Sequence, residues 1–307
     1  MKIFVSIGDP NGIGLEIALR SHSRVKDWGE IIYGVDEKVL FEASQRLGIE
    51  VPQDMECDPL GLESPIAPGV ISKEAGRYSF ESFKRGIERA KKGEVRAIVT
   101  LPVHKKAWSL AGIPYAGHTE ALREMTGEEA IMMMGKEGFF IALYTDHLPL
   151  SEVPQRVHER GVEGFLRRLS LSLPAMKACG VLGLNPHAGD QGVLGKEEEG
   201  IKRAIERVNQ ALGRELFFGP LVPDVAFIPS WRAKFDHYVA MYHDQGLIAL
   251  KILYFEESIN LSLGLPFVRT SVDHGTAFDI AYKGGNPSLL SYQNAIKMAL
   301  KLGSDKR

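Results

Sequence analysis

The sequence predicts an α/β fold with a largely parallel sheet. Short apolar runs rich in β-branched residues alternate with stretches in which apolar residues recur at helical spacing, a pattern typical of parallel strands joined by helices. Polar, glycine-containing segments directly follow many of the apolar runs. These positions are the carboxyl ends of the predicted strands, which is where open α/β sheets bind ligands. The 307 residues are about twice the length of a typical domain, so one large or two medium domains are expected.

Each element is predicted from its own pattern of residues. Short apolar runs predict strands at Lys2–Ile7, Glu30–Gly34, Ala97–Thr100, Phe139–Tyr144, Gly180–Leu184 and Tyr238–Met241. Helical spacing predicts helices at Gly14–Ser21, Glu37–Leu47, Phe80–Lys92, Val162–Leu171, Lys196–Leu212 and Pro287–Leu300. In Glu37–Leu47, for example, Leu40, Ala43 and Leu47 lie on one side. No fixed-period repeat appears, which disfavours a solenoid.

Charge and cysteine content exclude several classes of protein. The 37 basic and 39 acidic residues give a net charge of −2, and no basic run indicates a nucleic-acid partner. Cys57 and Cys179 are too few and too far apart for a disulfide framework or a thiolate zinc site. The N-terminus lacks a secretory apolar segment, and no apolar run approaches the roughly 18 residues that span a bilayer. We therefore expect a cytoplasmic protein with no membrane partner.

The first polar segment, Gly8–Gly14, follows a predicted strand and opens a predicted helix. Its sequence GDPNGIG is neither a G-x-G-x-x-G fingerprint nor a P-loop. The glycines could let a substrate or cofactor approach the backbone and the helix N-terminus. A tight strand-to-helix turn without a ligand is an equally good interpretation.

Three of the nine histidines share one context. His147, His187 and His243 each follow an apolar, strand-like run, in the sequences TDHLP, NPHAG and YHDQG. Three imidazoles from neighbouring strand ends, with an open position for substrate, would suit a catalytic divalent metal such as Zn²⁺. Their spacing is not a local metal motif, so ordinary exposed or hydrogen-bonded histidines are the alternative.

Further residues are candidates for binding an anion. His118 and Thr119 stand at a predicted helix start, where Thr119 could cap the helix or both could face an anion. Lys251 lies within the apolar run Leu247–Leu253, so its ammonium either reaches solvent or meets an anionic ligand. For Arg269, which precedes Thr270-Ser271, a surface salt bridge is the alternative to ligand binding.

The segment His274–Pro287 has the most specific sequence, HGTAFDIAYKGGNP. It predicts a glycine-containing turn, a short helix and a second glycine-rich loop. This composition would suit wrapping a nucleotide, although a pair of helix caps would use the same residues.

This segment resembles the cofactor loop of the metal-dependent isocitrate and isopropylmalate dehydrogenases, which follow HG[ST]A-x-DIA-x-[KQ]G-x-x-NP. The other motifs resemble a narrower group, the 4-hydroxythreonine-4-phosphate dehydrogenase family of the pyridoxal phosphate pathway. In chain order they are GDPNGIG, LPVHK, AGIPYAGHTE, HLPL, LNPHAG, AMYHDQGL and N-x-x-LGLPF-x-RTSVDHGTA. They run from Gly8 to Asn286, so the resemblance covers nearly the whole chain.

The resemblance implies a two-domain α/β/α sandwich of the isocitrate/isopropylmalate dehydrogenase type, with the active site in the interdomain cleft. Residues 1–125 and 262–307 would form the cofactor-side domain. Residues 126–261 would form the domain for metal, substrate and dimerisation. A homodimer with its active sites near the subunit interface is also implied.

The same resemblance assigns the site residues. One divalent metal per subunit (Zn²⁺, Mg²⁺ or Co²⁺) would be held by His147, His187 and His243. A small phosphorylated hydroxy-amino acid would be contacted by His118, Thr119, Lys251, Asn260 and Arg269. NAD or NADP would lie along Gly12, His274, Gly275, Thr276, Ala277, Asp279 and Asn286.

The implied reaction is oxidation of 4-phosphooxy-L-threonine at C3 to 2-amino-3-oxo-4-phosphooxybutanoate, which decarboxylates to 3-amino-2-oxopropyl phosphate. A bound metal would lower the pKa of the C3 hydroxyl. Asp244 and Lys251 are the two candidates for the catalytic proton acceptor.

The chain departs from the family pattern at a few positions, and these departures bear on the substrate. Asp146 stands where threonine is usual, Asp190-Gln191 replaces Glu-Gly, and Glu256-Glu257 replaces a glycine and a basic residue. One alternative is therefore a dehydrogenase of 4-phospho-D-threonate or 4-phospho-D-erythronate. A redox-inactive, metal-dependent phosphate-ligand binding protein is another, but a mere binder would not need the cofactor loop.

Overall fold

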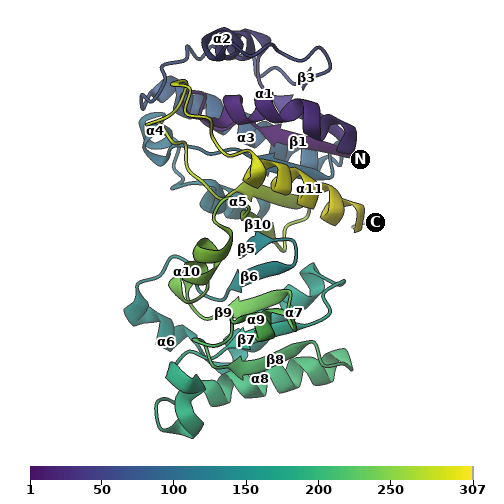
Figure 1. Cartoon of the computed structure of the whole chain (residues 1–307), viewed down its shortest axis with the longest axis vertical. Helices are drawn as coiled ribbons and strands as arrows, with labels where there is room; N and C mark the ends of the chain where they lie inside the picture. The colour runs from purple at the N-terminus through teal and green to yellow at the C-terminus, as the bar shows by residue number, and fades with distance from the viewer. Residues whose placement is uncertain (306–307) are drawn as a thin grey trace. The chain divides into compact units, whose positions relative to one another are not determined.

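The computed structural model describes residues 1–305 and divides into two units (Figure 1). Unit 1 comprises Met1–Ala130 and the described residues from Ile259 onward, and unit 2 comprises Ile131–Ser258. The sequence placed these boundaries after residues 125 and 261. In the structure they fall where strands begin, at Ile131 and Ile259.

Unit 1 is built on a sheet with strand order β3-β2-β1-β4-β11-β10. Its strands are β1 (Lys2–Ser6), β2 (Glu30–Gly34), β3 (Glu56–Cys57), β4 (Ala97–Thr100), β10 (Ile259–Leu263) and β11 (Val268–Val272). All neighbours in this unit pair in parallel except β10 and β11, which are antiparallel. The central strand β1 is apolar nearly throughout because both of its faces are covered, as expected for a parallel sheet.

The helices of unit 1 cover both faces of that sheet. They are α1 (Gly14–Val25), α2 (Glu37–Leu47), α3 (Lys73–Lys91), α4 (Lys105–Leu110), α5 (His118–Thr126) and α11 (Leu290–Asp305), with a short 3₁₀ turn η1 (Lys26–Trp28). Thr270 of β11 faces α11, where its Oγ1 donates to Ala295 O at 2.9 Å. Because side chains alternate along a strand, the neighbouring Arg269 points to the opposite face, the one that α3 covers.

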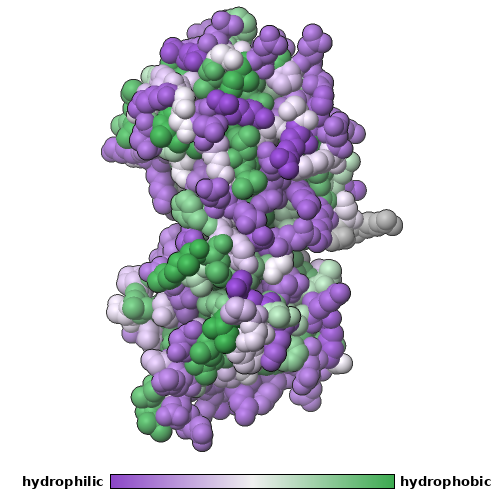
Figure 2. Space-filling model, viewed as in Figure 1, coloured by the Kyte–Doolittle hydropathy of each residue, from purple (hydrophilic) through white to green (hydrophobic). Residues whose placement is uncertain are grey.

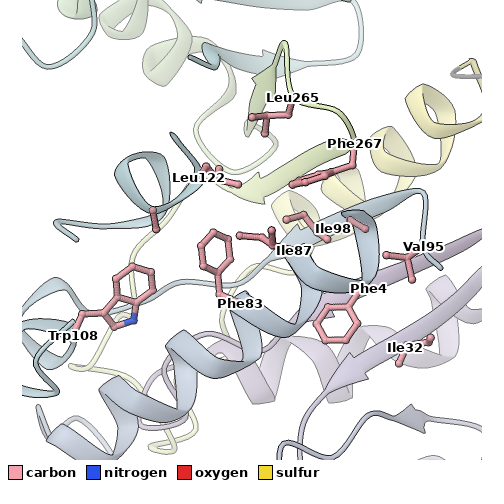
Figure 3. Packing of buried hydrophobic residues seen from close by; sticks show 12 residues of the cluster. Phe4, Ile32, Phe83, Ile87, Val95, Ile98, Trp108, Leu122, Leu265 and Phe267 are labelled. Carbon is pink, nitrogen blue, oxygen red and sulfur yellow. The ribbon is translucent and has the colours of Figure 1, made fainter. Parts of the chain in front are cut away.

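The core beneath α3 is continuous from β1 to α5. Phe4, Phe83, Ile98 and Trp108 belong to one buried cluster, and Figure 3 shows them between α3 and the sheet. The Trp108 indole N–H donates to Ser79 Oγ at 2.9 Å, so its one polar atom is satisfied inside the core.

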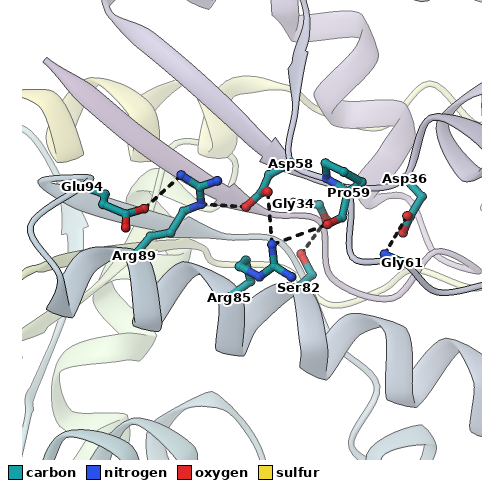
Figure 4. Close-up of polar contacts among 9 residues, drawn as sticks. All are labelled: Gly34, Asp36, Asp58, Pro59, Gly61, Ser82, Arg85, Arg89 and Glu94. Atoms are coloured by element: carbon teal, nitrogen blue, oxygen red, sulfur yellow. Dashed lines mark hydrogen bonds and ion pairs between the residues drawn. The ribbon is translucent and has the colours of Figure 1, made fainter.

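Ion pairs fasten the loop after β3 to α3 (Figure 4). The buried Asp58 carboxylate accepts from Arg89 Nε at 2.7 Å and from Arg85 Nη1 at 3.2 Å, and Arg89 also contacts Glu94 at 3.1 Å. The guanidinium groups of Arg85 and Arg89 therefore both have carboxylate partners.

The strands of unit 2 are arranged in the order β5-β6-β9-β7-β8. Its strands are β5 (Ile131–Lys136), β6 (Phe139–Leu143), β7 (Cys179–Leu182), β8 (Phe217–Leu221) and β9 (His237–Ala240). Its helices are α6 (Val153–Arg156), α7 (Glu159–Ser172), α8 (Glu197–Leu212), α9 (Pro229–Arg232) and α10 (His243–Tyr254), with 3₁₀ turns η2 (Leu150–Glu152) and η3 (Pro186–Gly192). Only the β5–β6 pair is antiparallel in this unit.

The predicted α/β fold is confirmed, and the predicted strands and helices are present with shifted ends. The helix predicted at Phe80–Lys92 begins earlier, at Lys73, where Ser72 Oγ accepts from Ala75 N at 3.1 Å as its N-cap. The last helix begins at Leu290 rather than Pro287. Within residues 1–305, no helix has the length and apolar character needed to cross a membrane.

Candidate functional site

Arg269 is a buried cation without a carboxylate partner. Its residue is 4% exposed, and its Nη1 donates to Ser262 Oγ at 3.0 Å and to Asn260 Oδ1 at 3.3 Å. Its Nη2 donates to Thr100 Oγ1 at 2.8 Å, while no ion pair in the described part of the chain includes it. Burial lowers the pKa of the guanidinium to about 10, and its Nε has no hydrogen-bond partner there. Such a cation is poised to receive an anion.

His118 stands beside this cation at the start of α5. Its imidazole lies 4.6 Å from the Phe83 ring and 5.5 Å from the Trp108 ring, measured between centroids. Burial, and secondarily the charge of Arg269, hold the pKa of His118 well below its usual value, so the ring is neutral. Its buried Nε2 has no hydrogen-bond partner among the described residues. Thr119 follows on the exposed side of the same helix end.

His147 and His243 lie next to each other in unit 2. Their strands β6 and β9 run in parallel, with Leu143 opposite Ala240, so the segments that follow leave the sheet at one edge. The ring centroids are 5.8 Å apart. This places two of the three predicted metal ligands together.

Each of these imidazoles has a carboxylate on its Nδ1 side. His243 Nδ1 is 2.7 Å from Asp244 Oδ1, and His147 Nδ1 is 3.8 Å from Asp146 Oδ2. Because an ionised carboxylate only accepts hydrogen bonds, Asp244 favours the His243 tautomer with a proton on Nδ1 and a lone pair on Nε2, whereas the distance at His147 is too long for a hydrogen bond. Histidine ligands of metals usually have such a carboxylate behind them, so this donor set fits a divalent cation.

His187, the third predicted ligand, lies in the exposed turn η3 after β7. Within residues 1–305, no set of three or more His, Cys, Asp or Glu side chains is arranged to hold a metal. The structure therefore brings His147 and His243 together and leaves His187 outside that pair.

The two candidate proton acceptors are both on α10. The Asp244 carboxylate is exposed and contacts the imidazole of His243. Lys251 is half-buried, and its Nζ lies 5.3 Å from the centroid of the Phe255 ring. Lys251 thus belongs to unit 2, whereas Arg269, His118 and Asn260 belong to unit 1.

The predicted cofactor segment packs closely on the first turn of the chain. Ile13 N donates to Thr276 O at 3.1 Å, and a Cβ on Gly12 would lie 2.8 Å from that same oxygen, so only glycine fits there. Tyr282 Oη donates to Pro10 O at 2.8 Å. The segment is therefore anchored to the Gly8–Gly14 turn by one backbone hydrogen bond and one from the Tyr282 side chain.

The same segment has several residues with positive φ values and several exposed polar side chains. Ala277, Tyr282 and Asn286 have positive φ values, which cost energy in non-glycine residues and gather at functional sites. Turns replace the short helix predicted after Gly275, so that prediction was wrong. Asp279 and Asn286 are exposed, no atom lies within 4 Å of a Cβ built on Gly275, and His274 Nδ1 contacts Gly275 O at 3.1 Å.

The sequence did not indicate the contacts that several residues of these sites make. Thr100 and Ser262 hold Arg269 but look like ordinary strand residues. The Asn11 side chain accepts from Ala67 N and donates to Val70 O, both at 2.8 Å, and so fixes the loop before α3. His104 stacks on Phe278 with centroids 5.0 Å apart. The LPVHK motif named His104 without indicating this contact.

Comparison with known proteins gives one consistent result. The family model of the pyridoxal phosphate biosynthetic protein PdxA matches residues 21–299. A 4-hydroxythreonine-4-phosphate dehydrogenase of Sulfurimonas denitrificans is 47% identical over 303 residues, covering 99% of this chain and 98% of the relative. One from Campylobacter fetus is 48% identical over 302 residues, covering 98% of both chains. The crystal structure of the Klebsiella pneumoniae enzyme of that name is 31% identical and superposes with a TM-score of 0.84 over 98% of each chain.

Proposed function

Since the chain belongs to the PdxA family of pyridoxal phosphate biosynthetic proteins, we propose that it oxidises 4-phosphooxy-L-threonine at C3 with NAD or NADP and a divalent metal. Its relatives are dehydrogenases, and the protein is an enzyme. The product, 2-amino-3-oxo-4-phosphooxybutanoate, is a β-keto acid that loses CO₂ to give 3-amino-2-oxopropyl phosphate.

The observation that carries this proposal is the uncompensated charge of Arg269. A buried guanidinium that contacts three neutral oxygens carries a charge that no anion neutralises. A phosphate group would neutralise it through charge-assisted hydrogen bonds. Neutral His118 supplies a further polar nitrogen, and Thr119 supplies a hydroxyl at the start of α5. Asn260 orients the guanidinium. Lys251, on α10 of unit 2, stays a proposed substrate contact because of its positive charge.

His147, His187 and His243 would hold one divalent metal, Zn²⁺, Mg²⁺ or Co²⁺. When bound, a cation at this position acts as a Lewis acid that lowers the pKa of the C3 hydroxyl and stabilises the developing oxygen charge. Asp244 orients the His243 imidazole from its Nδ1 side, and Asp146 lies 3.8 Å from Nδ1 of His147. Asp244 and Lys251 are the candidates for accepting the hydroxyl proton.

The nicotinamide cofactor would bind along the segment that includes Gly12, His274–Ala277, Asp279 and Asn286. Close backbone packing of Gly12 on Thr276 and the open space above Gly275 support this assignment. The exposed Asp279 carboxylate can accept hydrogen bonds from the ribose hydroxyl groups.

The enzyme would act as a homodimer through α10. This helix exposes Ile248, Ile252 and Phe255, which recur one turn apart on one side, and Ile252 is 79% exposed. Figure 2 shows apolar side chains gathered over this helix. An apolar stripe on a helix that also bears His243 and Lys251 supports contact with a second copy near the active site.

Substrate kinetics test the proposal directly. NADH formation is measured with 4-phosphooxy-L-threonine, 4-phospho-D-threonate and 4-phospho-D-erythronate, each with and without excess chelator. We expect turnover of the first compound only, and its loss on chelation. Preference for either sugar acid would instead identify the alternative dehydrogenase, and binding of all three without NADH formation would indicate a redox-inactive protein.

Metal analysis of His187→Ala tests the ligand set separately. We expect substoichiometric metal and a large loss of turnover. Full metal occupancy together with the wild-type turnover rate would show that His187 is not a metal ligand.

A further inference from the structure

The loop between β4 and α4 contacts both the candidate anion site and the candidate cofactor segment. At its start, Thr100 Oγ1 accepts from Arg269 Nη2 at 2.8 Å. At its end, the His104 ring stacks on the Phe278 ring, with centroids 5.0 Å apart and 18° between the ring planes. Phe278 lies in the middle of the candidate cofactor segment, residues 274–287. His104 therefore joins this loop to that segment.

The loop that carries His104 is bonded to the Gly8–Gly14 turn. Asp9 N donates to Pro102 O at 2.8 Å, and a Cβ on Gly8 would collide with the same oxygen. His104 comes only two residues after Pro102. Its ring therefore projects from a backbone that the turn holds in place.

The same turn also holds the loop that packs on the backbone of Phe278. Asn11 is fully buried, its O accepts from Gly69 N at 2.9 Å, and its Nδ2 donates to Val70 O at 2.8 Å. A Cβ on Gly69 would lie 2.6 Å from Phe278 O, so the two backbones are in direct contact. Phe278 is thus contacted at two points, its carbonyl by Gly69 and its ring by His104. Both points are attached to one turn.

The segment needs contacts of this kind because its own sequence does not select its backbone conformation. Ala277, Tyr282 and Asn286 have φ values of 45°, 58° and 43°, which are unfavourable for residues other than glycine. Ala277 directly precedes Phe278. If the contacts of Phe278 were lost, the segment would populate other conformations, and a smaller fraction of molecules could bind a ligand there.

The contact that His104 makes comes from the face of its ring. The residue is half-buried, and its buried Nδ1 has no hydrogen-bond partner within residues 1–305. Stacked aromatic rings stabilise a structure beyond the apolar area that they bury. An apolar ring at this position would keep the stack and would remove a buried nitrogen that has no partner.

We propose that His104 is a positioning residue for the nicotinamide cofactor, because its stack on Phe278 selects the backbone conformation in which residues 274–287 bind the nucleotide. The inference rests on the proposed assignment of the cofactor to this segment. It assigns His104 neither to the substrate nor to the reacting atoms. The affinity for the cofactor then depends on the fraction of molecules in which the stack is formed.

The first test measures the Kd for NAD by isothermal titration calorimetry, without substrate. His104→Ala should raise this Kd roughly 3- to 10-fold, the loss expected for one stacked ring pair. His104→Phe keeps the stack and should bind NAD as the wild type does. His237→Ala is the matched control, because His237 stacks on Phe140 in unit 2 with centroids 5.8 Å apart, and it should leave the Kd unchanged. Far-ultraviolet circular dichroism identifies folded protein in each variant.

Two further measurements separate a positioning role from a general loss of stability. In steady-state kinetics, His104→Ala should raise the KM for NAD and leave kcat and the substrate KM unchanged. Amide hydrogen exchange in residues 274–287, measured without cofactor, should be faster in His104→Ala than in the wild type and in His104→Phe.

A double-mutant cycle shows whether the effect passes through Phe278. Phe278→Leu removes the stack from its other side and should weaken NAD binding by itself. In that background, His104→Ala should weaken it no further, and an equal additional loss would overturn the positioning role.

The remaining outcomes distinguish this inference from its premise. A His104→Phe variant as weak as His104→Ala would assign the effect to a ring nitrogen and overturn the stack. If the wild type bound neither NAD nor NADP, the cofactor proposal and this inference would both fall. If the wild type bound NAD and His104→Ala bound it equally well, with the same amide exchange, only the inference would fall.

Discussion

Replacing Arg269 with methionine should weaken substrate binding while leaving the fold about as stable as the wild type. Methionine has a similar length and fills the same buried space without a charge. In the free enzyme the guanidinium has only the neutral oxygens of Thr100, Asn260 and Ser262 around it. The variant therefore removes a buried cation that no carboxylate compensates, and with it the main attraction for phosphate.

The size of both effects follows from the surroundings of the side chain. Burial lowers the Arg269 pKa from 12.5 to about 10, which corresponds to roughly 3 kcal/mol of destabilisation of the charged form. Losing the hydrogen bonds to the Thr100 and Ser262 hydroxyl groups and to the Asn260 side-chain oxygen costs about 1 kcal/mol each. The net change in folding stability is therefore close to zero, so Tm should stay within roughly 2–4 °C of the wild type. Loss of a charge-assisted phosphate contact costs about 2–3 kcal/mol, which raises the substrate KM roughly 30- to 150-fold.

Two assays check this prediction. Steady-state kinetics give the KM for 4-phosphooxy-L-threonine and for the cofactor, and only the first should rise. Thermal unfolding with and without inorganic phosphate should show protection of the wild type and none of Arg269→Met. Arg89→Met is the control, because its loss leaves the buried Asp58 with one partner fewer and should lower Tm without changing KM. A large fall in Tm with unchanged KM in Arg269→Met would show that Arg269 is structural.

Three other predictions follow from the same sites. The cofactor segment has no arginine and one lysine, Lys283, so NAD should exceed NADP in kcat/KM by about tenfold; equal efficiencies would place the discriminating residues elsewhere. The pKa of His118 in the folded protein lies below its unfolded value near 6.5. The contribution of this neutral imidazole to folding stability is therefore fully present above about pH 6.5 and is lost as the pH falls below it. Tm of the metal-free wild type should therefore fall more steeply between pH 7.5 and 5.5 than that of His118→Phe, and parallel curves would refute this. Ile252→Lys should shift the mass measured by light scattering from dimer to monomer, whereas Phe41→Lys on α2 should not; a dimeric Ile252→Lys would show that α10 is not the interface.

The sequence predicts the fold class well because each strand of a doubly covered sheet is a short apolar run. Lys2–Ser6, Ala97–Thr100 and Phe139–Leu143 are such runs, and the helices between them have a clear apolar side. The antiparallel strands β10 and β11 were not predicted, because Asn260, Ser262 and Arg269 interrupt their apolar pattern. Those interruptions are residues of the proposed anion site.

The helix α10 was missed for a related reason. Its residues from Gly246 to Tyr254 are apolar on nearly every side, so they lack the polar face by which an amphipathic helix is recognised. A helix that stays apolar where it is exposed has a surface suited to another protein chain, and this is the basis of the dimer prediction.

The candidate site could be predicted only in part from the sequence. The residues that hold its functional side chains in place lie far from them along the chain. Arg269 and its partner Thr100 are 169 residues apart, and Gln245 reaches Gly183 across 62. Short motifs identify the histidines, the arginine and the cofactor segment, but they do not show which neutral side chain holds each of them. Only the pairing of strands brings these residues together.

The contrast between the arginines of unit 1 suggests how the enzyme selects a phosphorylated substrate. Arg85 and Arg89 neutralise the Asp58 carboxylate, so their charge is already satisfied in the free protein (Figure 4). Arg269 is more deeply buried and has only neutral partners, so its desolvation is compensated only when an anion arrives. An analogue without the phosphate would leave this cation without an anionic partner in the complex. Discrimination against such analogues would therefore be set by the difference between the two complexes, because the phosphate pairs with the guanidinium whereas the analogue leaves it buried without an anion.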